Sequence, residues 1–310
     1  MNSGRPALSQ ELQANLFVRA GELRPELHRY CARLLGSVID GEDVVQDTLV
    51  RAFTALQDLD DVPPLRPWLF RIAHNRALDL LRSRAIRKAE PIDVAWDVAD
   101  LANIDPIEML MRQEAVKTAV ARFAELPLIQ RSVVILKDVL DEPLKEIAAL
   151  LDLTVDAVKG HLARGRSRLR AINAKAGSLP PARAASAAVD RYVTLFNQRD
   201  WDGLRALLST DVKLQQSTRA LRTGAEASLF FTIYATYDRI WLAPAWLEGR
   251  EVIAVFEDRA DPRPSYFMWL EWRDGKIIFI RDYRYARYVA AEAELVLAPV
   301  AQAEGNGKML

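Results

Sequence analysis

Cysteine and histidine are scarce in this sequence: the 310-residue chain has one cysteine and three histidines. A single cysteine cannot form an intramolecular disulfide, and no set of cysteine and histidine side chains has the spacing of a zinc site. Cys31 lies in a helical, apolar pattern and is expected to be a small core residue. We therefore predict neither a metal site nor a cofactor.

Long hydrophobic runs are missing as well. Residues 1–13 form no apolar signal segment, and no run of apolar residues approaches the length needed to span a membrane. The sequence therefore predicts a cytoplasmic protein that makes no contact with a membrane. With 310 residues, half of them hydrophobic, the chain is expected to fold into two or three domains.

The chain also has no excess of charge of either sign, because 42 basic residues balance 42 acidic ones. This balance argues against a uniformly basic nucleic-acid-binding protein. Positive charge is nevertheless concentrated locally, and local patches determine where nucleic acid binds. One cluster comprises Arg71, Arg76, Arg82, Arg84, Arg87 and Lys88, and a second comprises Lys159, Arg164, Arg166, Arg168, Arg170 and Lys175.

Amphipathic helical patterns fill residues 10–88. The pattern at 40–56 opens with acidic residues, which the helix dipole favours in a first turn. Prolines at 63, 64 and 67 enforce a loop before a helix at 68–87. Residues 90–106 are acidic and irregular, which is typical of an interdomain linker. Helical patterns return at 107–123 and 128–140.

Residues 145–170 read as two helices joined by a tight turn. The first helix covers 146–151, residues 152–154 supply the turn and the N-cap, and a basic second helix follows from Val155. At about 100° per residue, Val158 and Leu162 fall on an inward stripe and Arg164 lies opposite. This pattern is typical of a helix-turn-helix that presents its second helix to the DNA major groove. An ordinary helical hairpin with a solvated basic face is the alternative.

The character of the chain changes after about residue 185. A helix at 187–199 and a short helix ending at Leu208 precede strands at 240–246, 250–257, 266–272 and 276–284. Asp274 and Gly275 mark a hairpin turn between the last two strands. Helices followed by aromatic-rich strands indicate an α+β unit.

Four segments in this order resemble a bacterial extracytoplasmic-function (ECF) RNA polymerase sigma factor: DGEDVVQDTLVRAF (40–53), RPWLFRIAHNRALDLLR (66–82), ELPLIQRSVVILKDV (125–139) and the helix-turn-helix. The likeness covers roughly residues 10–172. It implies two all-α domains, a region 2 helical bundle at 10–90 and a region 4 helix-turn-helix domain at 111–173, with a linker at 91–110.

The C-terminal part is similar to the SnoaL-like group of the nuclear-transport-factor-2-like superfamily, through YVTLFNQRDWDGLRALLSTDV (192–212) and WRDGKIIFIRDYRY (272–285). This resemblance implies a linker at 174–185, an α+β cone with a curved sheet at 186–292 and a flexible tail at 293–310. The glycine-rich Asp-Gly-Gly-Gly-Lys segment of related domains is missing at 214–227. Control of the sigma factor by the same contacts is therefore not implied.

The sigma-factor resemblance assigns roles to individual residues. It implies that the β′ clamp helices of core RNA polymerase are bound by Asp43, Gln46 and Asp47. The minus-ten element is assigned to Trp68, Arg71, Asn75 and Arg82. The minus-thirty-five element is assigned to Lys159, Gly160, His161, Ala163, Arg164 and Arg168. Many relatives carry serine and arginine where this chain has Gly160 and His161, so more of the recognition is expected to depend on Lys159 and Arg164.

The C-terminal unit has candidate pocket residues, namely Tyr266, Trp269, Asp282 and Tyr283. It contains no histidine, which weighs against proton-transfer catalysis, so we predict a regulatory or ligand-sensing unit rather than an enzyme. The predicted partners of the chain are core RNA polymerase, promoter DNA and a small-molecule ligand of this unit. Two alternatives remain open: an operator-binding helix-turn-helix regulator, and a cyclase- or isomerase-like enzyme in the C-terminal unit.

Overall fold

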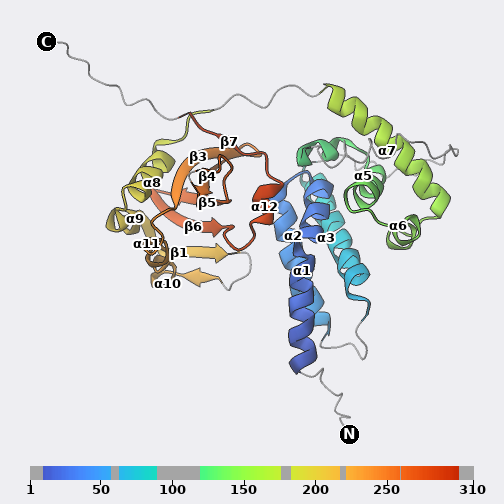
Figure 1. The fold of residues 1–310 in the computed structure, drawn as a ribbon, viewed down its shortest axis with the longest axis horizontal. Helices are drawn as coiled ribbons and strands as arrows, with labels where there is room; N and C mark the ends of the chain where they lie inside the picture. The colour runs from blue at the N-terminus through green and yellow to red at the C-terminus, as the bar shows by residue number, and fades with distance from the viewer. Residues whose placement is uncertain are drawn as a thin grey trace, which may run out of the picture. The chain divides into compact units, whose positions relative to one another are not determined.

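A computed structural model describes residues 10–56, 63–88, 119–175, 183–216, 221–258 and 260–299, with the backbone alone for 10–14. The chain divides into two compact units, Met1–Gly177 and Ser178–Leu310. Figure 1 shows that the first unit is helical and that the second combines helices with a sheet. The predicted fold class, helical sigma-factor regions followed by an α+β unit, is confirmed.

Three long helices open the first unit: α1 (Gln10–Leu35), α2 (Val38–Leu56) and α3 (Leu65–Lys88). Figure 1 shows them running side by side. The hydroxyl of Ser37 accepts a hydrogen bond from the backbone N–H of Asp40 and so caps the start of α2. Gly41 lets α2 approach α1 closely, because a Cβ there would lie 2.7 Å from the backbone of Ala32.

Among the described residues of this unit, the chain continues with the 3₁₀ helix η1 (Val120–Glu125), α5 (Leu128–Val134), the π-helical turn η2 (Ile135–Val139), α6 (Leu144–Leu151) and α7 (Val155–Lys175). The predicted helix-turn-helix is present as α6 and α7. Asp152 ends α6 in the left-handed conformation, and the Thr154 hydroxyl caps α7 by accepting from the N–H of Ala157. The predicted helix at 107–123 lies mostly outside the described residues, and its end belongs to η1.

One apolar core runs through the whole first unit. It includes Tyr30 and Leu34 of α1, Phe123 of η1, Leu136 of η2 and Leu162 of α7. The side chains of η1 and η2 therefore share a core with α1. The two helical segments that the resemblance assigns to separate domains pack here into a single unit.

The second unit is a seven-stranded mixed sheet with helices. Its helices are α8 (Ala187–Asn197), α9 (Trp201–Ala206), α10 (Ala225–Ser228), α11 (Phe230–Ala235) and α12 (Tyr288–Ala291). Its strands are β1 (Leu208–Gln216), β2 (Arg222–Thr223), β3 (Trp241–Leu247), β4 (Arg250–Phe256), β5 (Tyr266–Arg273), β6 (Lys276–Asp282) and β7 (Val296–Leu297).

The strand order is β2-β1-β6-β5-β4-β3-β7. All neighbours are antiparallel except β1 and β6, which are parallel. The predicted β5–β6 hairpin is present, and both of its turn residues, Asp274 and Gly275, have positive φ, as a type I′ turn requires. The same turn fixes which residues of β5 and β6 face each other near the hairpin.

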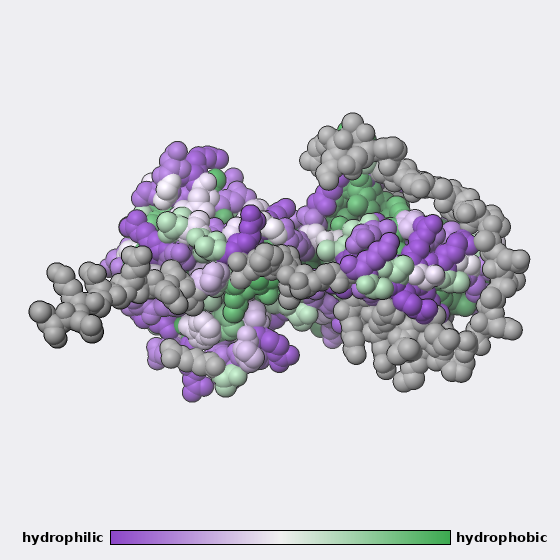
Figure 2. Space-filling view, turned by 90° about the horizontal axis from the view of Figure 1, so that it is seen from above, coloured by the Kyte–Doolittle hydropathy of each residue, from purple (hydrophilic) through white to green (hydrophobic). Residues whose placement is uncertain are grey.

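Hydrophilic residues are spread across the visible surface of each unit, with hydrophobic residues gathered in smaller areas (Figure 2). Among the described residues, no helix combines the length and apolar character needed to cross a bilayer. The apolar side chains that stay exposed are mostly single residues, among them Val50 and Ile86.

Candidate nucleic-acid interface and buried polar cluster

The outward face of α7 carries the side chains best placed to read DNA. Lys159 and Ala163 are exposed, one helical turn apart, so they lie on the same face. Lys159 is held only by a 3.3 Å ion pair with Asp156 on the helix surface, which salt and solvent weaken. Both residues are free to approach the edges of bases.

Gly160 and His161, which the resemblance places among the DNA-reading residues, are buried against the unit. Arg164 donates from Nη2 to Nδ1 of His161 at 3.2 Å. His161 therefore orients Arg164 rather than presenting its own ring to solvent. Arg164 is thus paired with His161, and their spacing of three residues on a helix is the sequence signal for this pair.

Arg166 and Arg168 have surroundings that differ from those of Lys159 and Ala163. Arg166 makes two hydrogen bonds to Asp138 of η2, at 2.6 and 2.9 Å, and Asp138 is 1% exposed. This is a buried structural ion pair. Arg168 is exposed and has no hydrogen-bond or ion-pair partner among the described residues.

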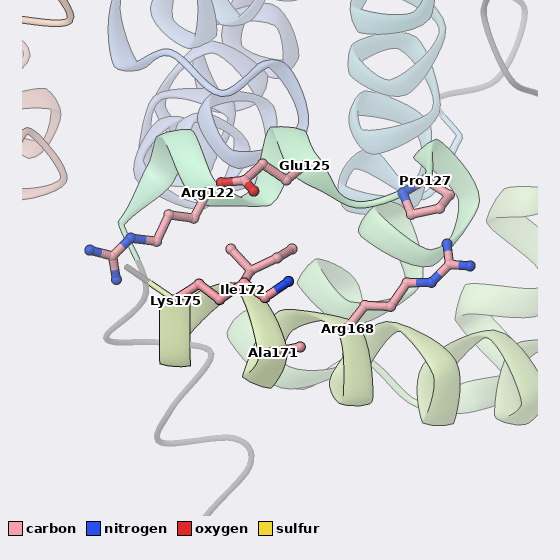
Figure 3. A pocket seen from close by; sticks show the side chains of 7 residues that line it. All are labelled: Arg122, Glu125, Pro127, Arg168, Ala171, Ile172 and Lys175. Carbon is pink, nitrogen blue, oxygen red and sulfur yellow. The ribbon is translucent and has the colours of Figure 1, made fainter. Parts of the chain in front are cut away.

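Arg168 lines a groove of about 620 Å³ between η1 and the last turns of α7. Figure 3 shows Arg122 and Glu125 extending from η1, while Arg168 and Lys175 extend from α7 and Ile172 points into the space between. Three cations and one carboxylate surround an apolar floor. The groove is basic, but Arg168 and Lys175 leave α7 on a different side from Lys159 and Ala163.

The start of α3 holds the residues predicted for the minus-ten element. Arg71, Asn75 and Arg82 are exposed, and Trp68 is half-buried against the core of the unit. Arg82 pairs with Asp79 at 3.5 Å. Arg71 donates from Nη2 to the carbonyl oxygen of Ala149 in α6, at 3.3 Å.

The outward face of α2 holds the residues predicted for polymerase. Asp43 is exposed, and Asp47 accepts from Arg51 at 3.2 Å and also from Arg76 of α3. Val50, 59% exposed, follows Asp43 and Asp47 on the same face. Val50 is not among the residues predicted from the sequence. An exposed β-branched residue in the middle of an acidic helix face was the available signal.

The strand register divides the four candidate pocket residues of the second unit. Met268 pairs with Asp282, and Trp269 pairs with Arg281. Because side chains alternate along a strand, Tyr266 and Asp282 share one face of the sheet. Trp269 and Tyr283 lie on the other face. The structure therefore brings together only two of the four.

Tyr266 and Asp282 belong to a buried polar cluster that the sequence analysis only partly found. Asp282 accepts from Nε2 of Gln216 at 2.8 Å and from the hydroxyl of Tyr234 at 3.4 Å. The hydroxyls of Tyr234 and Tyr266 lie 2.8 Å apart. The hydroxyl of Tyr192 on α8 is buried and has no hydrogen-bond partner among the described residues.

Burial raises the pKa of Asp282 to about 6, although the hydrogen bond from Gln216 opposes the shift. Burial, with Asp282 as the next cause, also raises the pKa values of Tyr192, Tyr234 and Tyr266. Near neutral pH the cluster therefore holds one carboxyl group close to its midpoint and three protonated tyrosines. Such a site can bind a polar group or store a proton.

Two family models match the chain: Sigma-70 region 2 over residues 20–86, and Sigma-70, region 4 over residues 118–169. The RNA polymerase sigma factor CnrH of Cupriavidus metallidurans is 38% identical over 141 residues, which make up 43% of this chain and 73% of CnrH. The ECF RNA polymerase sigma factor SigG of Mycobacterium tuberculosis is 32% identical over 235 residues, which make up 68% of this chain and 63% of SigG. This chain therefore spans less than two thirds of the length of SigG. The crystal structure of the Mycobacterium tuberculosis ECF sigma factor SigJ aligns with a TM-score of 0.34 at 21% identity, covering 88% of this chain and 98% of SigJ.

Proposed function

Because the chain belongs to the ECF family of RNA polymerase sigma factors, we propose that it binds core RNA polymerase, recognises two promoter elements and starts transcription. Its partners are then core polymerase and promoter DNA, and its place of action is the cytoplasm. It acts as an initiation factor and not as an enzyme.

One combination of features supports this proposal over an operator-binding regulator. The unit that presents Lys159 and Ala163 on a recognition helix also presents Asp43, Asp47 and Val50 on the outward face of α2. An acidic face with an exposed apolar residue is suited to a basic partner helix. A repressor that binds operator DNA alone has no use for such a surface.

The DNA contacts follow from the same geometry. Lys159, Ala163 and Arg164 read the minus-thirty-five element, with His161 holding Arg164 in place. Arg71, Asn75 and Arg82 contact the minus-ten element, where an extruded base costs a few kcal/mol that stacking and pocket contacts offset. Trp68 supports this surface from the core side. Arg168 is exposed on another side of α7, where it can contact at most a phosphate, which positions without specifying.

Run-off transcription with purified core polymerase and the full chain tests the proposal. We expect promoter-dependent transcripts that D47R and V50E abolish through loss of core binding. We expect K159A to lower initiation at promoters with an intact minus-thirty-five element. K213A, on an exposed strand position of the second unit, is the matched control and should have no effect. Operator binding without any core binding would refute the proposal.

We also propose that the second unit regulates the sigma factor by binding a small polar ligand at the cluster of Asp282, Tyr234, Tyr266 and Tyr192. The buried Tyr192 hydroxyl supports this, because it has no hydrogen-bond partner among the residues that the structure describes and such a group costs free energy until it is hydrogen-bonded. Deleting residues 186–310 and measuring transcription and core binding tests the regulatory role. Unchanged transcription and unchanged core binding after the deletion would refute the regulatory role. If the second unit instead converts a substrate and D282N abolishes that conversion, the enzyme alternative is favoured.

A further inference from the structure

Most hydroxyl protons of the buried polar cluster are already committed. Asp282 accepts from the Tyr234 hydroxyl through Oδ2 at 3.4 Å and from the backbone N–H of Arg284 through Oδ1 at 3.0 Å. Because the Tyr234 hydroxyl donates to Asp282, the proton in its 2.8 Å contact with the Tyr266 hydroxyl comes from Tyr266. The hydroxyl of Tyr192, which has no hydrogen-bond partner among the described residues, therefore keeps its proton for an acceptor oxygen.

Arg284 connects this cluster to the surface of the second unit. Its guanidinium carbon lies 5.3 Å from the ring centre of Tyr234 and 4.5 Å from that of Tyr237. Tyr237 is 44% exposed, so solvent reaches this side of the cluster. Within the part of the chain that the structure describes, Arg284 forms no ion pair with a carboxylate. A guanidinium that stacks on a ring keeps N–H donors in its own plane, where a carboxylate binds in a bidentate manner.

Arg287, three residues further along the chain, is the contrasting case. Its guanidinium lies 5.9 Å from the ring centre of Tyr266, but it also pairs with Glu257 at 2.8 Å. Glu257 thus offsets the charge of Arg287. Of these two arginines, Arg284 is the one whose charge is left for a ligand.

The same face of the sheet supplies an apolar wall. Met268 pairs with Asp282 and Ile253 pairs with Met268, and residues directly opposite each other on antiparallel strands share a face. Both apolar side chains are buried. On the helix side, the ring of Phe196 lies edge-on to that of Tyr234, with 5.4 Å between the ring centres. A ligand of the cluster therefore meets apolar groups beside its polar contacts, which favours an apolar or aromatic body.

We propose that the second unit binds an organic carboxylate that has an apolar body and an oxygen acceptor at its far end. Arg284 holds the carboxylate near the surface, and the Tyr192 hydroxyl donates to the far oxygen inside the unit. The proposal deepens the proposed function, on which it rests, by naming the class of ligand. Arg284 repels a cation, and an uncharged ligand leaves the guanidinium without an anion, so both of these classes bind less tightly.

Titration calorimetry of the full chain tests the class of ligand. The probes are para-hydroxybenzoate, para-hydroxyphenylacetate and para-hydroxyphenylpropionate, because the distance between Arg284 and Tyr192 selects one length. Each acid is compared with the acid that lacks the para hydroxyl and with the alcohol that replaces the carboxylate. We expect one para-hydroxy acid to bind about tenfold more tightly than its alcohol and about threefold more tightly than the acid without the hydroxyl. Binding by none of the acids, or equal binding of acid and alcohol, would overturn the proposal.

R284Q isolates the contact with the carboxylate. We expect it to weaken binding of the acid about tenfold and to leave binding of the alcohol unchanged. R287Q is the matched control and should match the wild type, because Arg287 is already paired with Glu257. If R284Q does not fold, R284K keeps the charge but loses the bidentate fork, so it should weaken binding of the acid several-fold. Equal losses in the Arg284 variant and in R287Q would contradict the proposal.

Y192F tests the inner contact. It removes a hydroxyl that has no partner among the described residues, so we expect the variant to be at least as stable as the wild type. Binding of the para-hydroxy acid should weaken about threefold, whereas binding of the acid without that hydroxyl should not change, which a cycle between protein and ligand variants detects as coupling. The same loss for both acids would refute the contact with Tyr192.

Run-off transcription in the presence of the acid that binds most tightly separates the class of ligand from the proposed function. Binding that changes no transcript level would count against regulation by the second unit and leave the class of ligand standing. A change in transcription after deletion of residues 186–310, with no acid bound by the full chain, would refute the class of ligand alone.

Discussion

Arg131 on α5 reaches Leu34 on α1, 97 residues away in sequence, through a 2.7 Å hydrogen bond from its guanidinium to the backbone carbonyl. The same guanidinium donates to the carbonyls of Ala124 and Leu126. Burial lowers the pKa of Arg131 to about 10, so the side chain stays charged at neutral pH. One side chain therefore ties α1, η1 and α5 together.

Replacing Arg131 should loosen the whole first unit. R131M leaves three carbonyls, two of them in buried hydrogen bonds, without their donor, and hydrogen bonds to charged groups contribute about 1.5–3 kcal/mol each. We expect a loss of roughly 3–5 kcal/mol, and R131K should recover little because lysine cannot span the carbonyls. Amide hydrogen exchange, resolved peptide by peptide, measures this loss of stability in the first unit. R122K, in the open groove, is the control and should match the wild type.

The Asp138–Arg166 pair should behave as a buried ion pair. D138A leaves the Arg166 guanidinium, 14% exposed, without its carboxylate, and we expect a loss of about 3–5 kcal/mol. The double variant D138L/R166M should recover most of it. Urea unfolding of the full chain, followed by exchange in α5 and α7, checks both. Equal stability of the single and double variants would contradict the prediction.

His161 should act on DNA only through Arg164. We expect H161A to weaken binding to the minus-thirty-five element about as much as R164A, by roughly 1 kcal/mol. The double variant should be no worse than either single one, which a double-mutant cycle detects as coupling. Additive losses would show that the ring contacts DNA by itself.

Asp282 should make the second unit less stable as pH rises. Its folded pKa of about 6 exceeds the unfolded value near 3.9, so the native state holds more protons between these values. Stability then falls as pH rises from about 4 to about 6, by at most about 3 kcal/mol. D282N should remove this slope, whereas D238N, at an exposed turn, should keep it.

His74 should give the first unit the opposite response. Burial, and next the charge of Arg82, lowers its pKa to about 4, and its Nδ1 lies 2.6 Å from the Tyr30 hydroxyl. The unfolded chain binds the proton first, so stability falls as pH drops from about 6.5 to about 4, by at most about 3 kcal/mol. H74Q should abolish this slope, and R82A should reduce it. Exchange measured at pH 4.5 and 7 separates the two units.

Local patterns predicted local structure well. The helix-turn-helix was predictable because the periodicity of Val158 and Leu162, the Thr154 cap and the turn at Asp152 all act within a few residues. The hairpin at Asp274 was predictable for the same reason. Strand β1 was not assigned from its own pattern, because its pairing with β6 depends on residues far along the chain.

The register of β5 and β6 decides which residue of β6 shares a face of the sheet with Tyr266. Counting outward from the Asp274–Gly275 turn would pair Tyr266 with Tyr283. A bulge between Glu271 and Trp272, with one extra residue on β6, shifts the register by one and pairs Met268 with Asp282. No local sequence pattern predicts that bulge. The bulge therefore places Asp282 rather than Tyr283 on the face of Tyr266, while Gln216 and Tyr234 reach the cluster from β1 and α11, 66 and 48 residues before Asp282.

The parallel pairing of β1 with β6 also fixes a sequence of events during synthesis. The hydrogen bond between Gln216 and Asp282 can form only after Asp282, 66 residues later in the chain, has been synthesised. Pairings so distant along the chain form slowly, and domains emerge from the ribosome N-terminal first. The helical unit therefore has time to fold before the sheet and its polar cluster can be completed.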